Sequence, residues 1–333
     1  MSTHLTQSPG VLVLPHLRIQ NANAISSPLT HGFPSITAFL GLMWALERKL
    51  EDRDLHITFH SVGVICHDFD EQTTDDGYVR KFRLTRNPVD KDGSSAAIVE
   101  EGRIHLDVTL VLAIDGGVIE ADPERQQQVA DAVAEVVAGM RIASGSVLPS
   151  AGPRWQSQPQ IQCWADDFEA RRQQFRKLRR RWLPGFALVA RDDLLAERAA
   201  DLQKIDSSAS ALDALLDLSR FNWRSHRSEE PDAATDGAKP KIDWRHDRSE
   251  GWIVPISVGY GALSELQPAG TVANARDTET PFRFVESLYS IGQWLGPHRL
   301  NDISQLLWYA DNEPPSGLYR CRNDYAATLT SQP

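Results

Sequence analysis

The apolar positions near the N-terminus change their spacing from one segment to the next. Residues 11–19 (VLVLPHLRI) form an apolar, β-branched run short enough for one buried strand. Residues 36–50 instead place apolar side chains at helical spacing, and Ser35 before them is a suitable N-cap. These patterns predict a strand, then a long polar loop within 18–35, and then a helix.

A second helix and three further strands follow in the same part of the chain. Residues 122–140 predict a helix because Asp122 suits its N-cap, Pro123 suits its first turn, and valines recur at helical spacing. Alternating or short apolar runs predict strands at 54–69, 103–115 and 159–164. The order strand–helix–strand–strand–helix–strand is that of a ferredoxin-like or RNA-recognition fold, so we expect an α+β domain over 10–165.

An insertion separates the second strand from the third. Within it, residues 78–86 (YVRKFRLTR) alternate basic and apolar side chains between Asp-Asp-Gly and Lys-Asp-Gly turn signals. These features predict an arm inserted at about 68–102. Such an arm suits the backbone of a nucleic acid, but an edge strand protected by basic residues against aggregation has the same pattern.

The C-terminal part, 166–333, is predicted to be a mixed helical part that packs on the first domain. Its stretch 225–251 is poor in apolar residues and is expected to form a flexible loop. Residues 252–264 predict a strand. Helices are expected at 210–221, at 280–296 with Thr280 as the cap, and at 299–309.

Positive charge is concentrated in one run, although the formal net charge is −10. Seven of the 35 basic residues lie in 171–181 (RRQQFRKLRRR), which contains no acidic residue. As a helix, this run would place four arginines on a common side as a track for phosphates. The alternative is a solvated helix that pairs with acidic residues of its own surface or of a partner protein. The four arginines are Arg172, Arg176, Arg179 and Arg180.

The sequence has few signs of catalysis, metal binding or membrane insertion. It lacks the GxSxG, GxxxxGK[ST], HExxH and strand-following GxGxxG motifs. Its cysteines are far apart and its histidines lack metal-ligand spacing, so we expect reduced thiols, a cytoplasmic location, and neither metal nor cofactor. No apolar run approaches the ~20 residues that cross a bilayer. His31, His60 and His67 are the candidate general bases if the protein cleaves RNA.

Several long and unusual strings resemble those of one protein family, in the same order along the chain. They are RIQNANAISSPLTHGFPS at 18–35, MRIASGSVLP at 140–149, LLWYADNEPPSGLYR at 306–320, and the segments 83–103, 183–195 and 272–288. The chain resembles the second-subunit family of the Csy proteins, Cas-five-type members of the repeat-associated (RAMP) superfamily in type I-F CRISPR surveillance complexes. The similarity extends from about residue 11 to about residue 320.

The resemblance implies a modified RNA-recognition fold with an inserted arm or thumb. It implies a non-catalytic subunit that binds the 5′ handle of the CRISPR RNA, pairs with the large subunit and caps the backbone-subunit filament in antiviral defence. In such systems a separate endoribonuclease matures the RNA. Two alternatives stay open: a metal-independent RAMP endoribonuclease that processes repeat RNA, and a scaffold that contacts mostly protein. In the scaffold, the run 171–181 would meet the large subunit or target DNA.

The residues expected to bind RNA lie in the opening segment, in the arm, in a Gly/Ser turn and at two arginines within 272–288. Amides and hydroxyls suit base edges and the ribose 2′-OH, rings stack on bases, and arginine neutralises phosphate. The turn at 143–147 matches the superfamily's glycine-rich loop with fewer glycines. Each of two segments also has a purely structural interpretation: the opening segment as a Pro-held surface turn that caps the first helix, and the Gly/Ser segment as an ordinary turn. The candidates are Arg18, Gln20, Asn21, Asn23, Ser26, Ser27, His31, Phe33, Arg83, Arg86, Asn87, Lys91, Arg141, Ser144, Ser146, Arg276 and Arg283.

Overall fold

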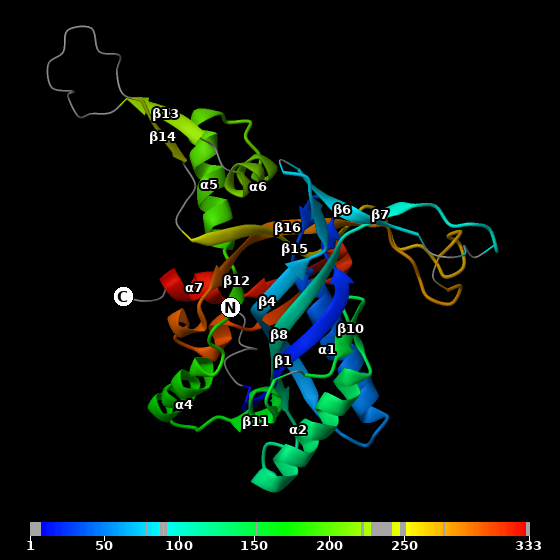
Figure 1. Ribbon diagram of the computed structural model, residues 1–333, viewed down its shortest axis with the longest axis vertical. Coiled ribbons are helices and arrows are strands. Elements are labelled where there is room, and N and C mark those ends of the chain that lie inside the picture. Colours follow the sequence, from blue (N-terminus) through cyan, green and yellow to red (C-terminus); the bar gives the residue numbers. More distant parts are fainter. Residues whose placement is uncertain are drawn as a thin grey trace, which may run out of the picture.

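One large antiparallel sheet dominates the α+β fold in the computed structural model (Figure 1). The predicted RNA-binding residues Asn87, Lys91 and Arg276 lie outside the described residues, as does most of the loop expected at 225–251. The structure describes residues 8–77, 79–86, 89, 92–150, 152–220, 223–227, 242–246, 251–275 and 277–330.

Strands and helices of the N-terminal half follow the predicted order. Four of its strands lie side by side as β4–β8–β1–β11, and each neighbouring pair is antiparallel. Helix α1 begins at the predicted cap, where the Ser35 hydroxyl accepts a hydrogen bond from the Thr37 amide. Helix α2 is likewise capped by the Asp122 carboxylate. The elements are β1 (Gly10–Asn23), α1 (Ile36–Glu51), β4 (Thr58–Glu71), β8 (Arg103–Asp115), α2 (Pro123–Ala138) and β11 (Gln160–Cys163).

The loop predicted within 18–35 is wrong in its first part, because β1 continues to Asn23. Ile19 and Ala22 are buried in the core, whereas Gln20 between them is exposed. The polar residues therefore mark the solvent face of a half-buried strand. The rest of the segment contains a short hairpin of β2 (Ile25–Ser27) and β3 (Thr30–His31).

A projecting arm leaves the main sheet between β4 and β8 (Figure 1). Its three strands form a small sheet of their own, in which Arg83 lies opposite Glu101. The basic–apolar alternation of the sequence therefore belongs to a strand of a projecting hairpin. The strands are β5 (Thr73–Asp75), β6 (Arg80–Thr85) and β7 (Val99–Glu101).

Five strands of the C-terminal part extend the main sheet beyond β4, which pairs with both β12 and β17. The strand predicted at 252–264 is confirmed as β15, and the helix predicted at 210–221 is confirmed as α6. The five strands are β12 (Phe186–Ala190), β15 (Trp252–Ala262), β16 (Val285–Leu295), β17 (Trp308–Glu313) and β18 (Leu318–Asn323).

The helix predicted at 280–296 is wrong, because 285–295 form the strand β16. Ile291 packs under α5 and α6, whereas Trp294 packs in the core on the α1 side. Because residues 290–295 of β16 are buried on both faces, the strand shows no alternation of apolar and polar residues. The cap signal at Thr280 belongs to a turn, in which the Asp277 carboxylate accepts a hydrogen bond from the Thr280 amide at 2.7 Å.

The helix predicted at 299–309 is also wrong. This stretch contains the 3₁₀ turn Ile303–Gln305 and then enters β17 at Trp308. Its consecutive leucines, Leu306 and Leu307, are both buried, so the apolar run reflects burial on all sides and not a helical stripe. The remaining elements are β9 (Arg141–Ile142), β10 (Gly145–Leu148), α3 (Arg154–Ser157), α4 (Phe168–Arg180), α5 (Asp192–Ile205), α6 (Ala211–Ser219), β13 (Trp223–Arg227), β14 (Ile242–His246), α7 (Tyr325–Thr330), and the 3₁₀ turns Pro297–Arg299 and Pro314–Ser316.

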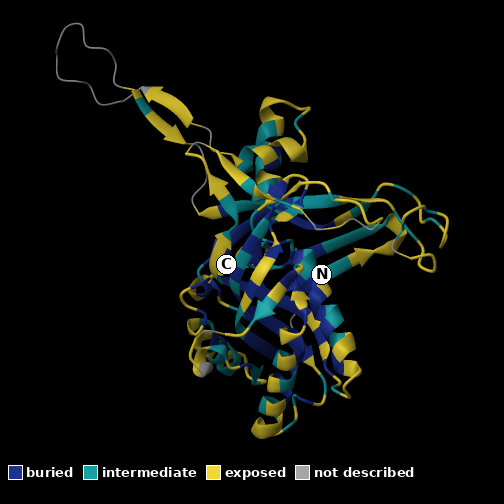
Figure 2. Cartoon of the chain, turned by 45° about the vertical axis from the view of Figure 1, so that its right-hand side comes forward, coloured by how far each residue is buried: buried dark blue, intermediate teal, exposed yellow. Residues whose placement is uncertain are grey.

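Helices cover both faces of the sheet over part of its area, and the buried residues gather there (Figure 2). Helices α1 and α2 pack on one face around Phe39 and Leu110. On the opposite face, Phe175 of α4 and Trp182 pack on Val13. Helices α5 and α6 cover the C-terminal strands β15 and β16. The exposed yellow regions of Figure 2 include the projecting arm.

The core on the α1 side predicts a clear difference between two phenylalanines. Phe39 is fully buried, so Phe39→Ala is expected to lower the free energy of unfolding by about 3–5 kcal/mol. Phe168 is largely exposed at the start of α4, so Phe168→Ala is expected to change it by less than about 0.5 kcal/mol. Chemical denaturation of the purified chains measures both, and equal losses would contradict this packing.

Candidate nucleic-acid interface

The face of the sheet opposite α1 and α2 changes character along its length. At one end, Val11, Val13 and Val111 are buried in the cluster that includes α4. Further along β1, Arg18 and Gln20 are exposed. The exposed end lies beside the base of the arm, so a polar strip of open sheet meets a projecting basic hairpin. Open sheet surfaces of this kind are used by RNA-recognition domains to hold single strands.

A polar cleft of about 400 Å³ lies at this open end of the sheet. The end of β1, the base of the arm and the β9–β10 turn form its walls. The fold therefore brings together side chains from three predicted segments that are far apart in sequence. Six predicted RNA-binding residues line the cleft: Gln20, Asn21, Arg83, Arg141, Ser144 and Ser146.

The β9–β10 turn is held against β1 in a defined conformation. Gln20 of β1 lies opposite Ser146 of β10 in the ladder. Ala143 and Ser144 both adopt positive φ, 47° and 68°, as tight two-residue hairpins require. The guanidinium of Arg141 donates a hydrogen bond to the Ser144 carbonyl at 3.2 Å. The polar groups on this side of the cleft are thus placed by backbone geometry.

Three arginines and one carboxylate set the charge of the cleft lining. The Arg103 guanidinium lies 3.1 Å from the Glu101 carboxylate, and Arg83 sits opposite Glu101 in the arm. Arg141 has an uncharged backbone partner. The lining therefore carries an excess of positive charge, in a chain whose net charge is −10.

Four lining residues were missed by the sequence prediction: Gln72, Thr85, Glu101 and Arg103. Gln72 and Arg103 join where the arm leaves the sheet, since the Gln72 amide donates to the Arg103 carbonyl at 2.7 Å. A signal for Arg103 exists in the sequence. Its neighbour Ile104 belongs to the apolar face of a clearly alternating strand, so Arg103 must point to the opposite, polar face.

Three predicted residues of the opening segment are engaged in local hydrogen bonds. The Asn23 side chain bonds both the amide and the carbonyl of Ile25. The hydroxyls of Ser26 and Ser27 both bond Thr30 Oγ1, at 2.7 and 2.5 Å, inside the β2–β3 hairpin. These side chains stabilise the hairpin and do not line the cleft, and Ser26 lines a different cavity.

His31 and Phe33 lie at a second cavity, on the helix side of the sheet. Phe33 stacks on Phe39 and meets Trp294 edge to face, with ring centroids 5.6 and 4.9 Å apart. His31 is exposed, and its Nδ1 lies 3.1 Å from the Glu71 carboxylate. The structure therefore separates these two rings from the cleft residues.

The other predicted positions lie away from the cleft lining. Arg18 is exposed one position before the buried Ile19, and Arg86 is exposed beyond the end of β6. Arg283 is half-buried, and its guanidinium lies close against Gly317.

The basic run 171–181 forms most of helix α4, as expected, at the opposite end of the sheet. Two of its cations pack on rings: Arg171 on Trp164 and Arg179 on Phe175. Burial lowers the pKa of Arg179, and the nearby charges of Arg176 and Arg180 lower it further. Mutual repulsion therefore raises the electrostatic energy of the helix, which a polyanion or an acidic protein surface would relieve.

The candidate general bases His31, His60 and His67 are not among the residues that line the cleft. His67 Nδ1 donates to the Pro184 carbonyl and Nε2 bonds the Thr109 hydroxyl, both at 2.7 Å, so both ring nitrogens are engaged. Burial lowers the pKa of His67, which keeps the ring neutral near pH 7. His60 lies 4.0 Å from the Asp115 carboxylate at the far end of β4.

Among the described residues, no group of three or more His, Cys, Asp or Glu side chains is arranged to hold a metal ion. Within the same residues, no helix is both long and apolar enough to cross a membrane.

Comparison with known proteins places the chain in a family. The family model described as CRISPR-associated protein (Cas_Csy2) matches residues 12–321. The chain belongs to the Csy2 family. It is 46% identical over 319 residues to the CRISPR-associated protein Csy2 of Pseudomonas aeruginosa (strain UCBPP-PA14), and the match covers 95% of this chain and 96% of that protein. Membership of the Csy2 family confirms the resemblance to Csy proteins and supports the assignment of the chain to the type I-F CRISPR system.

The close approach of the β9–β10 turn to β1 yields a prediction for this Csy2-family chain. A Cβ at Gly145 would lie 2.6 Å from Ile19 Cγ2 and 2.8 Å from the Ala22 amide nitrogen, whereas a Cβ at Gly117 meets nothing within 4 Å. Gly145→Ala is expected to lower the free energy of unfolding by about 1–3 kcal/mol, because backbone atoms of β1 must move. Gly117→Ala should have little effect. Denaturation curves of the two variants test this, and an unchanged Gly145→Ala midpoint would refute the contact.

Proposed function

We propose that this Csy2-family chain holds the single-stranded 5′ handle of a CRISPR RNA in the cleft at the base of the arm, as a non-catalytic subunit of a type I-F surveillance complex. One observation carries the proposal: six residues selected from three distant segments line one cleft at the open end of the sheet. Its positive lining suits a polyanion, and its amides and hydroxyls suit bases and ribose.

The two walls of the cleft suit different parts of a nucleotide. On the arm side, Arg83 and Arg103 supply guanidinium groups that bind phosphates. On the sheet side, the exposed Gln20 and Asn21 offer amides that can both donate to and accept from base edges. In this proposal the arm closes over the RNA backbone while β1 and the β9–β10 turn read its bases and 2′-OH groups.

The fold class supports the same proposal. We infer a ferredoxin-like, RAMP-type domain from the sheet order β4–β8–β1–β11, with α1 and α2 packed together on one face. The arm between β4 and β8 then corresponds to the thumb that the Csy resemblance implies. The family assignment to a Cas-five-type RAMP protein is part of this proposal.

The partners in the proposal follow from the family and from the charge of α4. The chain pairs with the large subunit of the complex and caps its filament of backbone subunits, in the cytoplasm. The basic helix α4 lies away from the cleft. Arg172 pairs with Glu169 at 3.9 Å, and the remaining excess of positive charge on the helix suits target DNA or an acidic surface of another subunit.

The proposal predicts the effect of removing cleft arginines. Arg83→Ala and Arg141→Ala should each raise the dissociation constant for handle RNA about tenfold, because each removes a charged hydrogen-bond donor. Each should also reduce the slope of log K against log salt by about 0.7, as loss of one phosphate contact on a single strand requires. Arg125→Ala, on an exposed turn of α2, is the matched control.

Fluorescence anisotropy over a salt series measures these effects on the chain purified with its complex partners. Binding and salt slopes equal to those of the Arg125→Ala control would contradict the proposed cleft. A loss confined to Arg172→Ala and Arg176→Ala would instead place the RNA on α4.

The alternative function, a metal-independent endoribonuclease, has its own test. The proposal predicts that repeat RNA stays intact when incubated with the chain in EDTA, because His67 has both nitrogens engaged and His31 lies at another cavity. Denaturing gel electrophoresis of the RNA measures cleavage. Cleavage that His31→Ala abolishes would overturn the non-catalytic assignment.

A further inference from the structure

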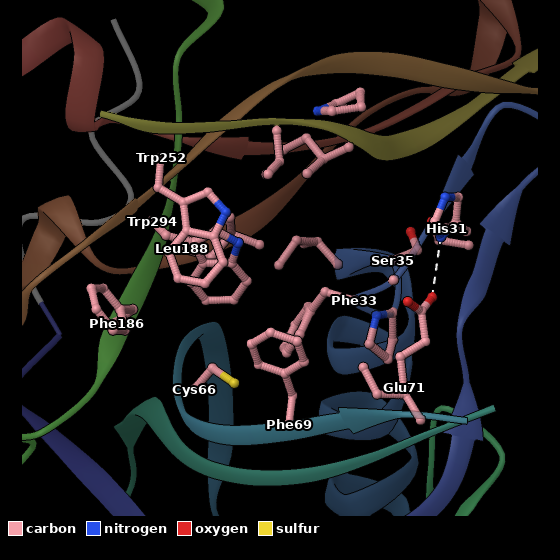
Figure 3. Close-up of a pocket in the computed structure, with 18 of the residues that line it drawn as sticks. His31, Phe33, Ser35, Cys66, Phe69, Glu71, Phe186, Leu188, Trp252 and Trp294 are labelled. Carbon is pink, nitrogen blue, oxygen red and sulfur yellow. Dashed lines mark hydrogen bonds and ion pairs between the residues drawn. The ribbon is translucent and has the colours of Figure 1, made fainter. Parts of the chain in front are cut away.

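A second cavity of about 260 Å³ opens on the helix side of the sheet, beside the first residues of α1 (Figure 3). Strands β4, β12, β15 and β16 contribute an apolar lining that includes Cys66, Leu188 and Ile256. Its chemistry differs sharply from that of the arginine-lined cleft. The cavity therefore needs a different ligand.

Aromatic rings that touch one another surround the mouth of this cavity (Figure 3). The Trp252 ring centroid lies 5.3 Å from that of Phe186, 6.4 Å from that of Phe69 and 6.0 Å from that of Trp294. Phe69, Phe186 and Trp252 are nevertheless 52%, 45% and 42% exposed. Large apolar side chains that remain exposed as one contiguous group mark an interaction surface.

The charged groups at the cavity argue against a nucleic acid and for a cationic partner. Its lining includes the carboxylates of Asp68 and Glu71, and no Lys or Arg occurs among its described lining residues. The basic groups present are the imidazoles of His31, which pairs with Glu71, and His67, whose pKa burial lowers. A phosphate backbone would meet carboxylates here without a guanidinium or ammonium to neutralise it.

We propose that this cavity binds a polypeptide segment of another subunit, which inserts one large apolar side chain and places an Arg or Lys beside it. The aliphatic floor accepts a Leu, Phe or Trp side chain, as buried anchors of protein interfaces require. The neighbouring cation lies against the carboxylate of Asp68 or Glu71, where the opposite charge favours it. This proposal rests on the proposed assembly with other subunits, but it does not depend on RNA in the cleft.

Site-specific photocrosslinking tests the occupant directly. p-Benzoylphenylalanine replaces Phe69 in the full chain, which is co-expressed with the other type I-F subunits and irradiated as the purified complex. The control probe replaces Phe168, an exposed phenylalanine on α4. We expect a protein adduct at position 69 well above the control, with an Arg or Lys within about four residues of an apolar crosslinked residue. An adduct to RNA alone, to a peptide without a basic residue, or no adduct would overturn the proposal.

Two variants measure the contribution of the cavity to assembly. Phe69→Ser and Asp68→Lys change exposed side chains and are expected to leave the fold intact, which circular dichroism checks. Each should lower the amount of the chain that is retained in the purified complex about tenfold. Asp70 is a neighbouring exposed carboxylate outside the cavity lining, and Asp70→Lys should leave that amount unchanged. Equal retention of all three variants would overturn the proposal. Handle binding by the same chains reports separately on the cleft, so loss of RNA binding with normal crosslinking would remove only the proposed RNA function.

Discussion

The structure depends on how β1 is paired along its two edges. One edge pairs with β8 from Gly10 to Asn23. The other edge pairs first with β11, at residues 10–13, and then with β10, at Arg18–Gln20. A register shift between Leu14 and Leu17 separates these two halves, and a second shift lies between Ile19 and Ala22. Because β1 lies between these partners, it sets the position of the β9–β10 turn relative to the arm, and so the geometry of the cleft.

The pairing of β1 also divides the two faces of the sheet by chemistry. Leu12, Leu14 and Ile19 face α1 and α2 in the main core, whereas the opposite face changes from valines under α4 to exposed polar side chains near the arm. The two cavities lie on different sides of this strand layer. Glu71 and Ile104 line the aromatic cavity, and their neighbours Gln72 and Arg103 line the cleft. A positive cleft and an acidic, aromatic cavity thus lie back to back, which suits the two proposed roles, RNA binding at the cleft and subunit assembly at the cavity.

Much of the N-terminal half could be predicted because its signals are local. The alternation of 103–115 and the caps at Ser35 and Asp122 arise within a few residues, and the structure confirms all three. The strand β16 could not be recognised, because burial on both faces removed its alternation, while a turn at Thr280 resembled a helix cap. The site, too, could be predicted only in part. Sequence pointed to Arg83 and Arg141 separately, but only the β1–β10 and β6–β7 pairings place them at one cleft and exclude Ser26 and Ser27.

The most direct measurement of the central claim is nucleotide-resolved crosslinking of the handle. CRISPR RNA carrying 4-thiouridine at single handle positions is assembled into the complex and irradiated, and the crosslinked peptides are identified by mass spectrometry. We predict adducts in the segments that line the cleft, at 20–21, 72, 83–85, 101–103 and 141–146. Adducts found only in α4, at 168–180, or only in other subunits would contradict this claim.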